Sequence, residues 1–215
     1  DCSTAIATIQ SATVGGISMW LNPVDATPSA SEKLISISDT STTFTYLNLS
    51  IETTGKISAL LRINSVVQWE FTTDDVTFTD GTWGQLAIIQ SGVEPEIYIN
   101  GIKVDITFTT TTDKTQWFDD YTINSINFGR SLTSWGPSGW FDGNLSNIAM
   151  WDSALSAANV LTIYNNGRPA DLTSLSPVAW WRLGENASFD GSDWTTPDMI
   201  GSNDGTSAGN PNLVG

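Results

Sequence analysis

The chain has 215 residues, of which 40% are hydrophobic and 14% charged, and its 23 acidic and 8 basic residues give a net charge of −15 at pH 7. This charge argues against nucleic acid and anionic membranes as partners, because both are bound through clustered Lys and Arg, and no apolar run approaches the ~20 residues that span a bilayer. The chain has no His and one cysteine, Cys2, which removes the commonest general base, the usual zinc ligand and any intramolecular disulfide.

Alternating hydrophobicity predicts strands through the first half of the chain. In residues 16–22, Ile17, Met19 and Leu21 alternate with Ser, Trp and Asn, the period of two that a strand shows. Pro23 ends this strand. Further β-rich runs occupy residues 34–39, 43–52, 56–63, 66–71 and 85–90, and the last is apolar almost throughout, as in a strand buried on both faces.

The strongest local signal is a hairpin within residues 96–104. Asn100 and Gly101 stand between two alternating runs, and both residue types accept the positive φ that a two-residue turn requires. Residues 126–129 and 143–151 are predicted as later strands, with Gly143 allowing a close approach or a bulge at the start of the second. About ten strands with turns between them predict a β-sandwich.

One short helix is predicted near residues 156–166. Ser156 can cap its beginning, and Gly167 can close its end in a left-handed conformation. The apolar positions Val160, Leu161 and Tyr164 fall on one face. One short helix among so many strands covers a corner of the sandwich and does not form a layer.

The segment after Pro177 is predicted to belong to the same domain. Its one strong strand is 178–183, and a turn-rich stretch follows to residue 215. A piece of this size without Cys or His cannot bury enough surface to fold alone. Trp180 and Trp181 point to opposite faces of such a strand, so at least one must be buried. We expect one domain over residues 1–215, with 168–215 packed on the sandwich as an extension.

Five segments carry a recognisable pattern: residues 16–20 (GISMW), 80–88 (DGTWGQLAI), 97–104 (IYINGIKV), 126–129 (INFG) and 141–156 (FDGNLSNIAMWDSALS). Their order and spacing across residues 16–167 resemble laminin-G-like domains of the concanavalin A-like superfamily. The resemblance implies an all-β fold, a jelly-roll-like β-sandwich of two antiparallel sheets with one short helix. Members include lectins, pentraxin-like proteins, adhesive modules and some glycosidases, so the fold does not settle the function.

The tail carries a second resemblance. Residues 180–185 together with Asp204 and Gly205 resemble the tails that follow laminin-G-like domains in structural proteins of marine viruses. This resemblance implies a virion structural protein.

The chain is predicted not to be an enzyme. Glycosidases of the superfamily carry a Glu-x-Asp-x-x-Glu strand that aligns carboxylates on one face, and this pattern is absent. Glu94 and Glu96 are the only close Glu pair, and Pro95 between them marks a turn or a sheet edge. Without His, Ser-His-Asp and Cys-His catalysis are excluded.

Trp residues in loops are the candidate glycan-binding residues. Sugars stack their C–H faces on exposed aromatic rings, and Asp or Asn side chains bind the hydroxyls. Trp135, Trp140 and Asp142 lie in one Gly/Pro-rich connection, and Trp117 and Asp119 lie in a second loop. Loops on a rigid sandwich are where recognition residues concentrate. The alternative is that these Trp residues close the ends of the sandwich, because aromatic rings bury large areas.

Four other Trp residues are assigned to the core or to a sheet surface: Trp20, Trp69, Trp83 and Trp151. Trp83 is assigned to the core because it opens a strand that is predicted to be buried.

Acidic residues near strand ends are candidate calcium ligands. The resemblance implies a calcium ion at an edge of the sandwich, and such a hard cation takes six to eight oxygen ligands. Asp142, Asp152 and the pair Asp74 and Asp75 are the candidates, although Ser146 stands where the family has an acid. The alternative is that these Asp residues start turns and cap strands.

These observations predict a non-enzymatic recognition or adhesion domain on an extracellular or virion surface. The expected partner is a glycan or a glycoprotein surface. The alternative is a structural decoration, fibre or filament subunit, whose partners are copies of itself or capsid and filament neighbours, since exposed strand edges can pair between subunits.

Overall fold

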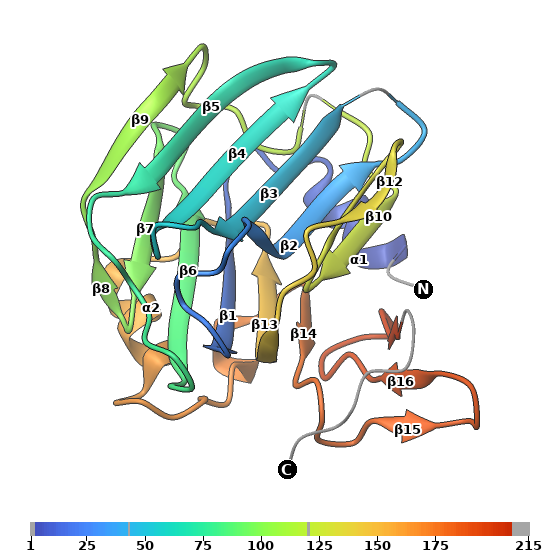
Figure 1. The fold of residues 1–215 in the computed structure, drawn as a ribbon. Coiled ribbons are helices and arrows are strands. Elements are labelled where there is room, and N and C mark those ends of the chain that lie inside the picture. The colour runs from blue at the N-terminus through green and yellow to red at the C-terminus, as the bar shows by residue number, and fades with distance from the viewer. Residues whose placement is uncertain (1–2, 43, 120, 208–215) are drawn as a thin grey trace.

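The computed structural model describes residues 3–42, 44–119 and 121–207, and within them it forms two packed sheets of six strands each (Figure 1). Sheet A has the order β14-β13-β1-β6-β7-β8, and sheet B has the order β10-β2-β3-β4-β5-β9. All pairs of neighbouring strands in both sheets are antiparallel. The predicted all-β sandwich is therefore confirmed.

The strands of sheet A are β1 (Gly15–Pro23), β6 (Gly84–Gln90), β7 (Pro95–Ile99), β8 (Ile102–Lys103), β13 (Gly143–Trp151) and β14 (Ala179–Trp181). Those of sheet B are β2 (Glu32–Asp39), β3 (Thr45–Ile51), β4 (Ile57–Ile63), β5 (Val66–Thr73), β9 (Ile106–Thr111) and β10 (Ser125–Phe128). The alternation signal did not reveal β9, whose Thr-rich sequence has few apolar positions.

Several smaller elements surround the sandwich. They are the helices α1 (Ser3–Ile9) and α2 (Ala157–Tyr164), a 3-10 turn (Thr173–Leu175), a hairpin of β11 (Ser131–Thr133) and β12 (Gly136–Ser138), and a small sheet of β15 (Ser188–Phe189), β16 (Trp194–Thr196) and β17 (Gly205–Thr206). No helix in the described ranges is long and apolar enough to cross a membrane.

The core lies between the two sheets, as the period of two requires. In β4, Ile57, Ala59 and Leu61 are fully buried, whereas Leu60 and Arg62 on the other face are half-buried. The inner faces of both sheets contribute to one continuous apolar cluster. Outward-facing residues of each sheet are therefore the ones available for other contacts.

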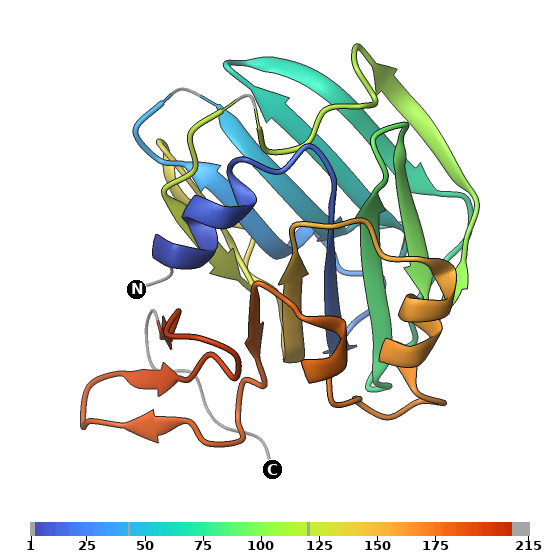
Figure 2. The same ribbon diagram turned by 180° about the vertical axis from the view of Figure 1, so that it is seen from behind.

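The predicted helix is α2, and it packs on the outer face of sheet A (Figure 2). Ser156 forms the expected cap, since its Oγ accepts from the backbone N–H of Asn159. Two details of the prediction were wrong. Asn165, with φ 46°, closes the helix in place of Gly167, and Leu161 is exposed because Val160 and Ile163 form the buried face. The second helix, α1, was not predicted.

The turn at Asn100 and Gly101 is confirmed. Their φ values are 51° and 79°, which match the paired left-handed residues of a type I′ hairpin. The close approach predicted at Gly143 is also present. A Cβ atom there would lie 2.5 Å from the carbonyl oxygen of Asn22 on the neighbouring strand, so only glycine fits.

The tail is attached to the sandwich through β14. Trp181 is fully buried in the core between the sheets, and Trp180 packs on the outer face of sheet A, so the two indoles point in opposite directions as predicted. Asp198 holds the chain that follows, because its carboxylate accepts from the backbone N–H groups of Trp180 and Ile200 and from the Asn203 side chain.

Candidate functional site

An arginine and a tyrosine face outwards from sheet B at one end of the sandwich. The strand register pairs Tyr46 of β3 directly with Arg62 of β4. The guanidinium carbon of Arg62 lies 5.7 Å from the centroid of the Tyr46 ring and 5.5 Å from that of the Phe44 ring. At such distances the face of an aromatic ring attracts a cation, so the two rings hold the guanidinium in place.

Phe44 and Trp135 complete this group. Phe44 has a φ of 52°, a left-handed backbone that bulky residues rarely adopt and that is often kept at functional sites. Trp135, in the turn between β11 and β12, stacks on Phe44 with ring centroids 5.5 Å apart and an interplanar angle of 23°. Its side chain nevertheless remains 77% exposed. We call Phe44, Tyr46, Arg62 and Trp135 the arginine–aromatic cluster.

The hairpin that carries Trp135 is anchored to the outer face of sheet B. The Ser38 Oγ donates to the carbonyl oxygen of Leu132 over 2.6 Å. The Ser131 Oγ lies 3.4 Å from the Ser36 Oγ. Both bonds join the hairpin to β2, so Trp135 is positioned by a fixed element and its exposed ring face is presented in a defined place.

Among the residues that the structure describes, Arg62 has no acidic partner. The described part of the chain contains three ion pairs: Lys103–Glu96, Lys114–Glu94 and Arg182–Glu185. Arg62 belongs to none of them, and its Nε atom is buried without a hydrogen-bond partner among the described residues. A buried N–H group left unbonded costs about 1–3 kcal/mol. The planar guanidinium is suited to a carboxylate or another oxyanion.

The structure separates the two exposed indoles that the sequence placed in one loop. Trp135 stacks on Phe44. Phe44 directly precedes Thr45, which pairs with Asp39 at the end of β2. Trp140 is also exposed, at 61%, but it lies near the beginning of β2. The residue before it, Gly139, accepts a hydrogen bond through its carbonyl oxygen from the backbone N–H of Lys33 in β2. The two indoles therefore lie toward opposite ends of β2 and do not form one site.

The second predicted loop does not present its Trp. Trp117 is buried in the core and stacks on Trp69 at 6.3 Å, so the prediction that it binds ligand is wrong. This Trp closes the sandwich, as the alternative proposed, while Asp119 beside it is exposed. The core assignment of Trp83 is wrong in the opposite sense, because its side chain is 43% exposed. Trp20, Trp69 and Trp151 are buried as predicted.

The four candidate calcium ligands do not come together. Asp142 and Asp152 flank the nine residues of β13, and at about 3.3 Å per residue they stand ~30 Å apart. Asp74 and Asp75 follow β5 in the other sheet, where Asp74 accepts from the Thr107 hydroxyl. The described residues contain no group of three or more His, Cys, Asp or Glu arranged to hold a metal ion.

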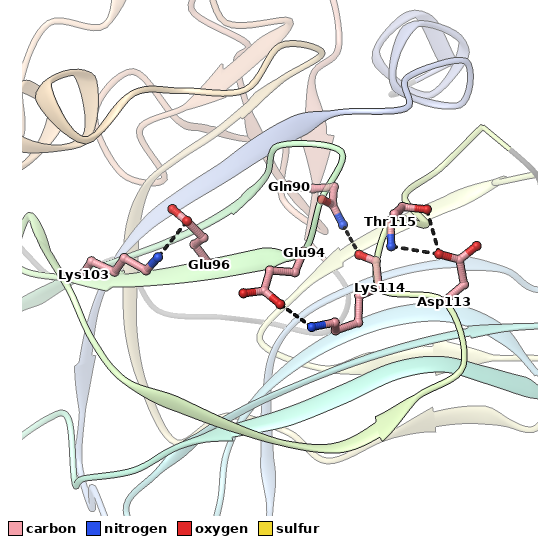
Figure 3. Close-up of polar contacts among 7 residues, drawn as sticks. All are labelled: Gln90, Glu94, Glu96, Lys103, Asp113, Lys114 and Thr115. Carbon is pink, nitrogen blue, oxygen red and sulfur yellow. Dashed lines mark hydrogen bonds and ion pairs between the residues drawn. The ribbon is translucent and has the colours of Figure 1, made fainter.

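The close Glu pair is engaged in two separate ion pairs (Figure 3). Glu94 contacts the Lys114 ammonium, and the Glu96 carboxylate lies 2.7 Å from the Lys103 Nζ. Burial disfavours the charge on Glu96, but hydrogen bonds from Lys103 and Tyr98 outweigh it and lower its pKa. A carboxylate with a lowered pKa is a poor general acid, so this pair does not resemble the acid–base pair of a glycosidase.

Sequence reasoning missed three members of the arginine–aromatic cluster, namely Phe44, Tyr46 and Arg62. One signal was present: Arg62 is the only charged residue in residues 57–63, and the alternation places it on the outer face. No local pattern reveals that Trp135 and Arg62 both contact Phe44, since the fold alone brings these segments together.

Comparison with solved structures identifies folds similar to this one. The CBM40 of the IT-sialidase of Ruminococcus gnavus aligns with a TM-score of 0.61 at 14% identity, over 74% of this chain and 86% of that one. A putative carbohydrate binding protein from Bacteroides ovatus aligns with a TM-score of 0.63 at 16% identity, over 91% of this chain and 52% of that one. The SAP-like pentraxin of Limulus polyphemus aligns with a TM-score of 0.53 at 16% identity, over 74% of each chain.

A search of curated proteins finds no match. At such low identities the structural likenesses establish the fold alone. The sequence itself matches the family described as the concanavalin A-like lectin/glucanases superfamily over residues 4–161, which is most of the chain. This protein therefore belongs to the concanavalin A-like lectin/glucanases superfamily.

Proposed function

We propose that this chain is a non-catalytic glycan-binding module that holds an acidic sugar at the arginine–aromatic cluster. The observation that carries the proposal is the Arg62 guanidinium, which two aromatic rings hold without an acidic partner among the described residues. A sugar carboxylate would accept hydrogen bonds from this guanidinium, and the exposed face of Trp135 would stack on the sugar ring.

The likeness to known modules supports this proposal. The CBM40 of Ruminococcus gnavus has been solved bound to α2,3 sialyllactose and to α2,6 sialyllactose, both of which carry a carboxylate. The net charge of −15 would repel an acidic glycan from most of the surface. Binding therefore needs a local cation that is not neutralised by an acid, and Arg62 has no acidic partner in the part of the chain that the structure describes.

Calorimetry or a glycan array with sialylated and uronic-acid glycans, compared with their neutral counterparts, tests the proposal. The Arg62→Gln variant should lose roughly 10- to 150-fold in affinity, because a charge-assisted hydrogen bond contributes about 1.5–3 kcal/mol. Trp135→Ala should lose roughly 2- to 10-fold, the range expected for one aromatic contact. The Arg168→Gln variant removes the same charge from an exposed position after α2 and should bind as the parent does.

Two results would contradict the proposal. One is the absence of acidic-glycan binding by folded protein, and the other is binding that Arg62→Gln leaves unchanged. The measurements should be made both in calcium and in chelator, because calcium ligation by Asp142 or another of the predicted acids is a separate proposal. Sedimentation of the same samples tests the assembly role, since a fibre or decoration subunit should form higher oligomers.

A glycan-binding role fits a protein displayed outside cells or on a virion surface, where glycans are encountered. The composition supports that setting, with 14% charged residues, no His and a sequence rich in Thr, Ser and Asn. Detection of the native protein in purified virions or in a secreted fraction, and not in the cytoplasm, is the expected observation.

A further inference from the structure

The outer face of sheet A, on the opposite side of the sandwich from the arginine–aromatic cluster, holds a pocket. Its volume is about 180 Å³, and it is lined by Trp20, Trp83, Ser146, Gly167 and Pro169. Trp20 lies on β1 between Met19 and Leu21, which point into the core, so the Trp20 indole points outwards. We call this the sheet A pocket.

Its floor is rigid and aromatic. Trp20 is 3% exposed and stacks on Tyr164 of α2, with ring centroids 5.9 Å apart and an interplanar angle of 15°. Trp83 stands at the side, and its indole is 43% exposed although Gly84 directly after it is buried in β6. An exposed indole beside an apolar hollow leaves one ring face free for a ligand.

Two amide side chains stand next to the aromatic rings. The register of β1 and β13 pairs Trp20 with Ser146 and, two residues along the same face, Asn22 with Asn144. The register of β1 and β6 pairs Leu21 with Gly84. Because the two strands are antiparallel, Trp83, the residue before Gly84, lies beside Asn22, the residue after Leu21.

Both amides retain hydrogen-bonding capacity. The Asn22 Nδ2 donates to the carbonyl oxygen of Gly81 over 3.2 Å, which leaves its Oδ1 available. Asn144 is half-buried, and within the described ranges its amide makes no hydrogen bond. Both amides lie next to the pocket, outside its five lining residues, where they can hydrogen-bond to the part of a ligand that extends past the lining.

None of the five lining residues is charged. The pocket therefore suits a neutral ligand with an apolar face and a polar rim. A pyranose ring has this chemistry, because its C–H face stacks on an indole while its hydroxyls bond to amides. The small volume suits one ring and not a chain of rings.

From these contacts we infer that the sheet A pocket binds a single neutral pyranose, for which Trp83 supplies the stacking face and Asn22 and Asn144 bind the hydroxyls. The site is independent of Arg62, so the chain would carry two sugar sites on opposite faces. A module with two sites could bridge two glycan chains, and such bivalency raises the avidity for a glycan-coated surface.

Titration of the full chain with neutral monosaccharides, namely glucose, galactose, mannose and N-acetylglucosamine, tests the inference by intrinsic fluorescence and saturation-transfer NMR. One of these sugars should produce a saturable change. Trp83→Ala should weaken that response at least fivefold, whereas Trp135→Ala and Arg62→Gln should leave it unchanged. Because Trp83 is partly exposed, its loss should not unfold the chain, and the melting midpoint checks this.

Asn144→Leu separates a sugar from an apolar occupant. This variant keeps the size of the side chain but removes its hydrogen bonds, so sugar binding should fall while binding of an apolar group would be kept or strengthened. The inference is overturned if no neutral sugar gives a saturable response, or if the response survives both Trp83→Ala and Asn144→Leu. It is also overturned if Trp83→Ala only converts a dimer into a monomer, since the pocket would then hold a second copy.

Discussion

Replacing Trp181 with Ala should remove much of the stability of the protein. Trp181 is fully buried, lies 5.1 Å from the Phe128 ring between centroids, and donates its Nε1–H to the carbonyl oxygen of Asn203 over 2.6 Å. Burial of ~200 Å² of indole at ~25 cal/mol per Å² corresponds to about 5 kcal/mol. Measured losses for buried Trp→Ala changes are about 3–5 kcal/mol. A typical domain has a stability of only ~5–15 kcal/mol, so the loss is a large part of the total.

The measurement is thermal unfolding followed by circular dichroism. For a protein of this size, each kcal/mol shifts the melting midpoint by about 2–4 °C, so Trp181→Ala should lower it by roughly 6–20 °C. Phe189→Ala is the matched control in the same tail, because Phe189 is 47% exposed and stacks only on Trp194 among described aromatic residues. The control should cost no more than about 1 kcal/mol. Equal shifts for the two variants would refute the conclusion that the tail is docked through Trp181.

Three further predictions concern the tail, the pH dependence and the hairpin. Truncation after Pro169 should give insoluble or unfolded protein, and a soluble fragment with an unchanged melting midpoint would show that the tail is dispensable. Burial, and then the hydrogen bond to Glu96, raise the pKa of Tyr98 from 10.0 to about 12. Because the Tyr98 hydroxyl ionises at a lower pH in the unfolded state than in the folded state, its contribution to the free energy of unfolding should be complete below pH 10.0 and should fall as the pH rises to about 12. Urea unfolding at a series of pH values measures this fall, which the Tyr98→Phe variant should not show. Gly101→Ala should lower the free energy of unfolding by about 1–2 kcal/mol in the same assay, because the φ of Gly101 is 79° and the new Cβ would lie 3.1 Å from the Leu161 side chain. An unchanged midpoint would show that the turn relaxes.

Features set by neighbouring residues could be predicted from the sequence. The strand at Ile17, Met19 and Leu21 follows from a period of two, and the turn at Asn100 and Gly101 follows from the positive φ that these residues accept. The cap at Ser156 is equally local. Each of these signals lies within a few residues, so the backbone conformation they favour is the same before and after the sheets pack.

Burial of single aromatic residues depended on the tertiary structure. Trp117 precedes Phe118 and Trp83 precedes the largely apolar strand β6, yet Trp117 packs on Trp69 in the core while Trp83 lines the sheet A pocket. A loop residue becomes buried only when a distant segment covers it. Composition and spacing do not specify which segment that is.

The candidate sites also depended partly on the sequence and partly on the tertiary structure. The sequence by itself determined a His-free, acidic, all-β chain with exposed aromatic residues in its loops, and Trp135 among them. Only the tertiary structure brought both Trp135 and Arg62 against Phe44, and only the strand register placed Asn144 opposite Asn22. The physical reason is that these contacts join segments far apart in the chain, and their geometry is set by the packing and pairing of whole strands.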